Sequence, residues 1–378
     1  MSRLLLFANT DWYLWNFRHS LALALRDAGH EVLLLSPDGP HGEKLRALGL
    51  RWQPVPMDRR SLNPLREAML LGHLVRLMRR EKPDLVHGFT IKCAVYGSLA
   101  ARMAGVPARV NAVAGMGYVF TSDDAKARAL RPLVRGLMRL ALGGGDARLI
   151  LQNPDDVALF ERAGLVAPAR IRLIPGSGVD CARFAPDPAR IAGERMRVLL
   201  PARLLWDKGL AEYADAARLL RQREVPVDLL LAGEPDPGNP AAVPEATVRG
   251  WVGEGLLQWL GHVDDMPALF RSVDVVALPS YREGLPKGLI EAAASGCALV
   301  ATDVPGCREV VARDGIDGLR VPVRDGAALA DAIERLARDP DLRARLGKAA
   351  RDKAMAEFDE RIVIGRTMRV YGELGIRS

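Results

Sequence analysis

Apolar runs and helical segments alternate along most of this 378-residue chain. LLLFA at residues 4–8 is fully apolar, RHSLALALRDAG at residues 18–29 repeats apolar side chains at helical spacing, and EVLLLS at residues 31–36 is apolar again. A strand, a helix and a second strand in this order form a βαβ unit, whose strands pair in parallel. The alternation therefore predicts an α/β protein with a parallel sheet that is covered by helices on both faces.

The same alternation starts a second time near residue 196. The Gly- and Pro-rich segment at residues 171–190 is interpreted as a linker, after which MRVLLPARL at residues 196–204 opens a new series. We predict two similar α/β domains in tandem, over residues 1–180 and 181–356, with a cleft between them. A last helix at about residues 357–378 is expected to cross back onto the first domain. Because ligands of open parallel sheets bind beyond the carboxyl ends of the strands, functional residues are expected there.

Charge is distributed unevenly along the chain. Residues 1–196 carry 28 Lys and Arg against 18 Asp and Glu, whereas residues 197–378 carry 25 against 28. The first half therefore has a net charge of +10 and the second a net charge of −3. This asymmetry predicts an anionic partner for the first half: nucleic acid, an anionic membrane surface or a lipid phosphate. An arginine-rich composition with solvated helix faces is the alternative.

The apolar runs and the cysteines narrow the class of protein. No apolar run approaches the roughly 18–20 residues that a membrane span requires, and the opening MSRLLLFANTDW lacks the length and cleavage site of a signal peptide. The four cysteines form no CxxC pair. We interpret the chain as a reduced, cytoplasmic protein without a structural zinc site.

The stretch YREGLPKGLIEAAASGC at residues 281–297 contains two glutamates, Glu283 and Glu291, eight positions apart. Glu283 follows the apolar run DVVALPS, and Pro286 suits the first turn of a helix that contains Glu291. One interpretation is a plain surface helix with Glu291 facing solvent. The other is a site that holds a sugar by its hydroxyls and a phosphate at the helix N-terminus. A carboxylate beside the apolar AAA run is costly to bury unless it binds something.

Two cations follow the strand that opens the second half. In PARLLWDKGL, Arg203 and Lys208 flank a strand-to-helix turn. Arg as a fork and Lys as a point charge can clamp a diphosphate, although two solvated loop cations are equally compatible with the pattern. In AGEPDPGNP, Gly233 allows close backbone approach after a strand, or marks an ordinary turn.

Several nucleotide and hydrolase motifs are absent. No G-x-G-x-x-G follows a strand, and neither a Walker A motif nor G-x-S-x-G occurs. The single Asp-x-Asp, Asp339-Pro340-Asp341, is expected at a helix start. A diphosphate would therefore be neutralised by Arg, Lys and a helix end, without a metal.

These motifs together resemble a known family. EGLPKGLIE, RLLWDKG and VPGCREVV (residues 304–311) are similar to the retaining glycosyltransferases of family GT4, which have the GT-B fold. LWNFRHSLALALRDAGHEV, VHGFTIKCAVYGSLAAR, AGMGYVF, LQNPDDVALF and PGSGVDCARF extend the resemblance through the first half. They resemble the bacterial branch that adds N-acetylhexosamine or similar sugars to undecaprenyl-diphosphate-linked sugars. The resemblance implies an α/β GT-B protein with two Rossmann-like domains whose parallel sheets face each other across a cleft.

The resemblance also implies roles for individual residues. Glu283 would meet the hydroxyls of the donor sugar, and Glu291 would hold the ribose. Arg203 and Lys208 would neutralise the diphosphate. Together with Glu283, they are the three residues expected to be catalytic. The remaining donor-side residues, the last two of them near the base, are Gly284, Leu285, Pro286, Lys287, Gly233, His262 and Val263. The acceptor-side or cleft residues are Asn16 and Arg18, placed in a loop after the first strand, and Thr90, Lys92 and Asn153; for Lys92 and Asn153 a structural role in a loop is the alternative.

Two departures from the family pattern occur in the first half. Many relatives have a Gly-Gly pair after the first strand, where this chain has Asn9-Thr10-Asp11-Trp12. Many also have a histidine where this chain has Ala114-Gly115-Met116. A catalytic histidine is therefore not carried over.

The prediction is a metal-independent, retaining glycosyltransferase without a cofactor. Its donor is a UDP-sugar, namely a UDP-N-acetylhexosamine, and its acceptor is a polyprenyl-diphosphate-linked sugar. The protein is expected in the cytoplasm, bound peripherally to the anionic inner face of the plasma membrane, with no nucleic-acid partner. The alternatives are a GT4 transferase with another acceptor or NDP-sugar, a GT-B-fold UDP-sugar epimerase, a phosphorylase with pyridoxal phosphate, and a basic scaffold that binds nucleic acid.

Overall fold

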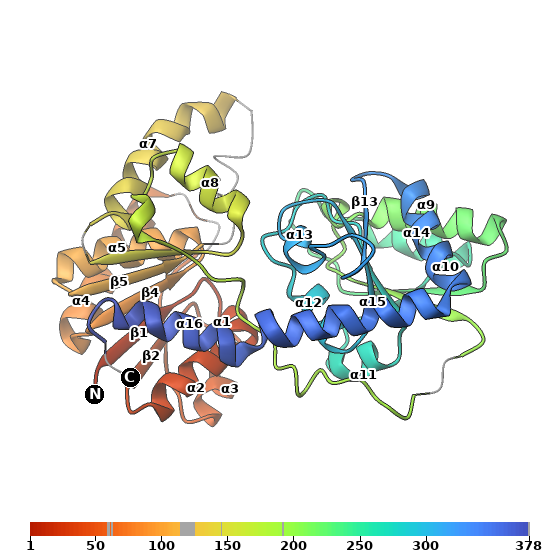
Figure 1. The fold of residues 1–378 in the computed structure, drawn as a ribbon. Helices are drawn as coiled ribbons and strands as arrows, with labels where there is room; N and C mark the ends of the chain where they lie inside the picture. The colour runs from red at the N-terminus through yellow and green to blue at the C-terminus, as the bar shows by residue number, and fades with distance from the viewer. Residues whose placement is uncertain (59–60, 62, 114–124, 145, 191–192, 377–378) are drawn as a thin grey trace. The chain divides into compact units, whose positions relative to one another are not determined.

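The computed structural model describes residues 1–376 except 59–60, 62, 114–124, 145 and 191–192. The chain forms two compact units (Figure 1). Unit 1 comprises Met1–Ser177 and Ile362–Ser378, and unit 2 comprises Gly178–Arg361. The chain therefore passes between the units after Ser177 and after Arg361, where the sequence places the crossings after residue 180 and near residue 357.

Unit 1 is built on a seven-stranded parallel sheet in the order β3-β2-β1-β4-β5-β6-β7. Its strands are β1 (Arg3–Phe7), β2 (Glu31–Ser36), β3 (Arg51–Pro54), β4 (Leu85–Phe89), β5 (Ala108–Ala112), β6 (Ala147–Leu151) and β7 (Ile171–Leu173). The helices of unit 1 are α1 (Asp11–Phe17), α2 (His19–Asp27), α3 (Gly42–Ala47), α4 (Pro64–Glu81), α5 (Ile91–Ala104), α7 (Ala125–Leu142), α8 (Pro154–Arg162), the 3-10 turn η1 (Pro168–Arg170) and α16 (Glu360–Gly372).

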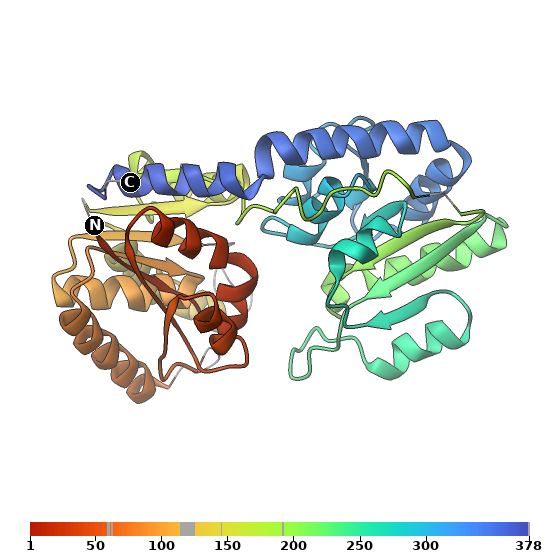
Figure 2. The same cartoon turned by 90° about the horizontal axis from the view of Figure 1, so that it is seen from below.

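Successive side chains of β1 enter two different hydrophobic clusters. Leu4 and Leu6 pack with apolar residues of α2 and α16, whereas Leu5 and Phe7 pack with residues of α4 and α5. This alternation follows from the two-residue period of a strand. Figure 2 shows the strands of unit 1 between these helical layers. The predicted parallel sheet covered on both faces is confirmed.

Two sequence-based predictions in unit 1 are corrected by the structure. The predicted linker at residues 171–190 begins with the edge strand β7, which pairs with β6 through Leu149 and Ile171. Three residues are too few to show a strand period, so only pairing with β6 reveals this strand. The segment after β1 is helix α1 rather than a loop, and Thr10 caps it by accepting a hydrogen bond from the Tyr13 N–H at 3.0 Å.

Unit 2 is built on a six-stranded parallel sheet in the order β10-β9-β8-β11-β12-β13. Its strands are β8 (Met196–Pro201), β9 (Val227–Ala232), β10 (Gln258–Gly261), β11 (Val275–Leu278), β12 (Ala298–Thr302) and β13 (Leu319–Val321). The helical elements of unit 2 are η2 (Trp206–Lys208), α9 (Leu210–Gln222), α10 (Glu245–Gly253), α11 (Met266–Arg271), α12 (Lys287–Ala294), α13 (Cys307–Val310), α14 (Gly326–Arg338), α15 (Pro340–Lys353) and the π-helical turn η3 (Ala354–Phe358).

Both sheets reverse their strand order at one point. Counted within each unit, the first six strands follow the doubly wound order 3-2-1-4-5-6. The order reverses between β1 and β4 in unit 1 and between β8 and β11 in unit 2. Connections leave such a switch point in opposite directions, which opens a crevice at the carboxyl ends of the two strands.

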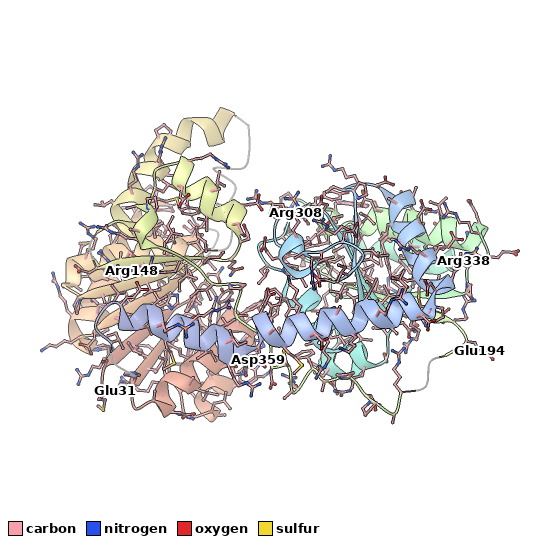
Figure 3. All side chains as sticks on the ribbon, in the orientation of Figure 1. Glu31, Arg148, Glu194, Arg308, Arg338 and Asp359 are labelled. Carbon is pink, nitrogen blue, oxygen red and sulfur yellow. The ribbon has the colours of Figure 1, made fainter. Side chains whose placement is uncertain are left out.

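The last helix, α16, is fixed to unit 1 by apolar packing and by an ion cluster. Val370 and Tyr371 are buried in the cluster that contains Leu4 and Leu6. Glu373 accepts hydrogen bonds from Arg172 at 2.7 Å and from Arg148, labelled in Figure 3, at 2.8 Å. The hydrogen bonds from these two arginines lower the pKa of Glu373 to about 2. The cluster joins the C-terminal helix to β6 and β7.

Candidate functional site

The carboxyl ends of β8 and β11 carry an ion pair at the switch point of unit 2. Lys208, in the turn η2 after β8, donates from Nζ to Oε1 of Glu283, which follows β11, at 2.7 Å. The side chains are 19% and 13% exposed. Both residues are predicted from the sequence to be catalytic, and the structure brings them together. A mostly buried pair at a switch point is placed where nucleotide ligands bind in doubly wound sheets.

Backbone contacts set the position of Lys208. Gly209 has a φ of +74°, and a Cβ atom there would lie 2.2 Å from the Pro279 carbonyl oxygen. The Tyr281 N–H donates to the Asp207 carbonyl at 2.8 Å. Only glycine permits this close approach in this conformation, so the loops after β8 and β11 are held against each other.

A second contact joins the same two loops through helix α9. The Tyr281 hydroxyl donates to Oε1 of Glu212 at 2.7 Å, and the guanidinium of Arg324 lies 4.8 Å from the centre of the tyrosine ring. Burial and the hydrogen bond to Glu212 raise the pKa of Tyr281 to about 12. Tyr281, Glu212 and Arg324 were not predicted from the sequence, although Tyr281 stands two positions before Glu283.

The loop after β12 packs against the Glu283 turn. Gly306 has a φ of +82°, and a Cβ atom there would lie 2.7 Å from the Gly284 carbonyl oxygen and 2.8 Å from that of Glu283. Gly306 of the VPGCREVV segment therefore packs closely against the backbone of the turn that carries Glu283. Leu285 packs at the edge of the unit 2 core.

Glu291 does not face solvent. Its side chain is 14% exposed, and Lys287 Nζ lies 3.6 Å from Oε1 one turn earlier on α12. Burial raises the pKa of the Glu291 carboxyl above its usual value, while Lys287 acts in the opposite direction. The interpretation as an outward-facing residue of a surface helix is therefore excluded. Pro286 is the N-cap of α12 rather than its first residue, and it supplies no side-chain cap for the helix N-terminus.

Arg203 is not brought to the Lys208–Glu283 pair. Its side chain is 63% exposed, and Nη1 donates to Oδ2 of Asp236, after β9, at 2.7 Å. The predicted clamp of Arg203 and Lys208 is therefore not assembled: each cation has its own carboxylate partner. Sequence spacing could not reveal this, since Asp236 is 33 residues away.

Three other predicted residues lie at the same sheet edge. Gly233 has a φ of +154°, and a Cβ atom there would lie 1.9 Å from the Ala202 carbonyl oxygen, so it closely approaches the backbone of the residue that follows β8. His262 follows β10, is exposed, and lies 3.2 Å from Asp264. Val263 packs at the edge of the unit 2 core.

The acceptor-side residues of unit 1 have distinct environments. Arg18 is buried between α1 and α2, where its guanidinium covers the Phe89 ring at 4.4 Å. Asn16 lies in α1 and donates to the Trp12 carbonyl at 2.9 Å. Asn16 is therefore part of a helix, and Arg18 is the single turn residue that joins α1 to α2, whereas the sequence predicted a loop for both. Thr90 follows β4 and has a φ of +70°.

Lys92 and Asn153 make structural contacts. Nζ of Lys92 donates to Oε1 of Glu67 at 2.8 Å and to the carbonyls of Asp58 and Ser61 at 2.8 and 3.0 Å. Asn153 caps α8 by accepting from the Asp156 N–H at 2.7 Å. These contacts match the structural alternative given for both residues.

The two departures from the family pattern have different outcomes. The Asp11 carboxylate, which follows Thr10, accepts hydrogen bonds from the N–H groups of His41 at 2.5 Å and Gly42 at 3.1 Å. Asp11 thereby ties α1 to the start of α3. The segment with Ala114, Gly115 and Met116 lies outside the described residues.

The described residues contain neither a metal-binding cluster nor a helix that could span a membrane. No group of three or more His, Cys, Asp or Glu side chains there is arranged to bind a metal ion. Within that same part of the chain, no helix combines the length and the apolar character needed to cross a bilayer. The four cysteines are buried and free.

The fold and the sequence match known proteins over nearly the whole chain. The structure of Anabaena Alr3699/HepE in complex with UDP has a TM-score of 0.80 at 21% identity, covering 99% of this chain and 100% of that chain. Together with two doubly wound sheets, this likeness defines a GT-B fold.

Two family models divide the chain between them. Residues 3–152 match the model described as glycosyl transferase 4-like, and residues 195–339 match glycosyl transferases group 1. The chain belongs to this family of glycosyltransferases, GT4, and is an enzyme of that type.

Relatives with defined names include two bacterial enzymes. The N,N'-diacetylbacillosaminyl-diphospho-undecaprenol alpha-1,3-N-acetylgalactosaminyltransferase of Campylobacter jejuni is 28% identical over 369 residues, which cover 95% of each chain. The UDP-Gal:alpha-D-GlcNAc-diphosphoundecaprenol alpha-1,3-galactosyltransferase of Escherichia coli is 27% identical over 316 residues, 81% of this chain and 79% of that protein.

Proposed function

We propose that this glycosyltransferase moves a sugar, an N-acetylhexosamine, from a UDP-sugar to a polyprenyl-diphosphate-linked sugar with retention of anomeric configuration. The proposal depends above all on the mostly buried Lys208–Glu283 pair at the switch point of unit 2. Glu291, held at 14% exposure on the following helix, supplies a carboxylate for the ribose hydroxyls.

Relatives support the choice of substrates. Both the Campylobacter and the Escherichia enzymes are named for acceptors in which a sugar is joined to undecaprenol through a diphosphate. The first transfers N-acetylgalactosamine and the second galactose, so the acceptor class is shared while the sugar differs. UDP is the nucleotide in the Anabaena complex and in the name of the Escherichia enzyme.

The proposed chemistry is a front-face displacement. The bond from the anomeric carbon to the UDP oxygen breaks, and a bond to the acceptor hydroxyl forms on the same face. The acceptor proton passes to the departing β-phosphate oxygen. Lys208 stabilises the charge that grows on this phosphate, and Glu283 holds the sugar hydroxyls, so the protein acts by positioning and by preorganised charge. Arg203 would contribute once it exchanges Asp236 for the phosphate.

We propose that the reaction needs no divalent metal. A diphosphate can be neutralised by Lys208, by Arg203 and by the uncapped N-terminus of α12, whose N–H groups and dipole favour anions.

We also propose peripheral binding of unit 1 to the anionic cytoplasmic face of the plasma membrane. Unit 1 contains 28 Lys and Arg against 16 Asp and Glu, a net charge of +12. On α4, Leu65 and Met69 are 75% and 64% exposed one turn apart, with Arg66 between them in sequence. Exposed apolar side chains among cations suit an anionic lipid surface.

A donor screen followed by transfer tests the function. Thermal stabilisation by a panel of NDP-sugars is expected to select UDP-sugars, and the selected donor is then incubated with a polyprenyl-diphosphate-linked sugar. NMR of the product is expected to show retained configuration. An inverted product would refute the retaining mechanism, and turnover of the UDP-sugar without any acceptor would indicate an epimerase instead.

A further inference from the structure

Arg18 is a buried cation at the switch point of unit 1. The residue joins α1 to α2 and is 5% exposed. The guanidinium carbon is 4.4 Å from the centre of the Phe89 ring, at the carboxyl end of β4, and 5.7 Å from that of Tyr13. β4 and β1 are the strands between which the sheet order reverses.

The guanidinium of Arg18 has unused hydrogen-bonding capacity. Nη2 donates to the Tyr13 hydroxyl at 3.2 Å, whereas Nε is buried and has no partner. No carboxylate in the described part of the chain forms an ion pair with it. Aromatic faces attract a guanidinium, but they do not satisfy its five N–H donors. A buried charge in this condition is costly unless an anion completes it.

A second buried polar side chain, His87, contacts the same aromatic ring and has one ring nitrogen without a partner. The centre of the His87 ring is 4.0 Å from that of Phe89, and Nδ1 is 2.6 Å from the Tyr371 hydroxyl. Burial lowers the pKa of His87 well below its ordinary value, and Arg18 lowers it further, so the ring is neutral. When the Tyr371 hydroxyl donates to Nδ1, the ring proton is on Nε2, which is buried without a partner. Arg18 and His87 then each present an unused N–H.

We propose that Arg18, whose guanidinium covers the Phe89 ring that His87 also contacts, binds a phosphate group of the acceptor's diphosphate. The planar guanidinium can donate two parallel hydrogen bonds to the oxygens of a phosphate. Arg18 also lies at the sheet edge where doubly wound sheets bind ligands. The proposal rests on the proposed function for its acceptor class. It assigns the donor diphosphate to unit 2 and the acceptor diphosphate to unit 1.

The test compares two acceptors that differ in the diphosphate. One is the accepted sugar on a short-chain prenyl diphosphate, and the other is the same sugar as a neutral alkyl glycoside. The ratio of their kcat/KM values is measured for wild type, Arg18→Met and the control Arg26→Met, which removes an exposed cation from α2. Arg18→Met is expected to lower the ratio about 30-fold, because truncating one partner of a buried charge contact has an effect of this order. Arg26→Met is expected to leave it unchanged.

Equal losses with both acceptors would overturn the proposal, since they would give Arg18 a structural role. A loss of UDP affinity in Arg18→Met, measured by calorimetry, would also overturn the proposal, because Arg18 would then bind the diphosphate of the donor. If Arg18→Met does not fold, Arg18→Lys is measured instead. This variant keeps the positive charge but loses the planar guanidinium, and it is expected to lower the ratio about 5-fold or more. An unchanged ratio would refute phosphate binding by Arg18.

Failure of the proposed function can be distinguished from failure of anion binding at Arg18. If the wild type transfers to no lipid-linked acceptor, inorganic pyrophosphate is titrated into the UDP-saturated protein. If the wild type binds pyrophosphate and Arg18→Met binds it about 30-fold more weakly, the result supports an anion-binding site at Arg18. Equal binding, or no binding to the wild type, overturns it.

Discussion

Removal of the Lys208 charge separates the structural from the catalytic part of the Lys208–Glu283 pair. The two side chains are 19% and 13% exposed and 2.7 Å apart. Lys208→Met leaves the Glu283 carboxylate mostly buried without a cation. The expected loss in the free energy of unfolding is about 3 kcal/mol, the lower end of the usual range, because the carboxylate keeps some contact with solvent. In a domain of this size, such a loss lowers Tm by about 6–12 °C.

The double variant Lys208→Met/Glu283→Gln leaves no buried charge and is expected to recover most of this stability. Activity behaves differently. The single and the double variant are both expected to lose about 10²–10³ in kcat/KM, because neither stabilises the charge that develops on the leaving phosphate.

The assay is a thermal melt and a transfer rate for wild type, both single variants and the double variant. The four melting curves form a double-mutant cycle that measures the coupling of the pair. A double variant that regains both stability and near-wild-type turnover would refute the reasoning, because the pair would then be a structural contact only.

Four further predictions follow from the structure and the proposal. Glu291→Gln is expected to raise Tm by about 2–4 °C, since it removes a desolvated charge, and to weaken UDP binding about 10-fold or more, as seen by calorimetry; an unchanged UDP affinity would contradict a ribose contact. The folded pKa of Glu373, about 2, lies below its ordinary value of 4.5, so its stabilisation of α16 is present above pH 4.5 and is lost as the pH falls toward 2. Amide exchange of α16 during acid titration is expected to show this loss in wild type and not in Glu373→Gln. Transfer activity is expected to survive EDTA, and restoration of an EDTA-inactivated enzyme by Mg²⁺ would exclude the metal-independent mechanism. Binding to anionic vesicles is expected to decrease between low and high salt in co-sedimentation, whereas salt-independent binding would contradict the electrostatic contact.

The tertiary structure changed the meaning of several predicted residues. Arg203 and Lys208 are five positions apart, and the sequence alone suggests one clamp; the fold pairs them with Asp236 and Glu283 instead. Glu291 could have faced solvent on a surface helix, and only packing of α12 excluded this.

The sequence by itself determined the α/β class, the two parallel sheets and the presence of Glu283 and Lys208 at the carboxyl ends of strands. Those features depend on the local periodicity of apolar residues and on the residues that directly follow a strand, and both can be recognised within a short stretch of sequence. Only the tertiary structure decided that β7 is a strand and that Arg18 rests on Phe89. It also decided that Lys208 meets Glu283, which is 75 residues away. Such pairings arise from the strand order of a sheet, and strand order is set by packing of the whole domain and not by any single segment.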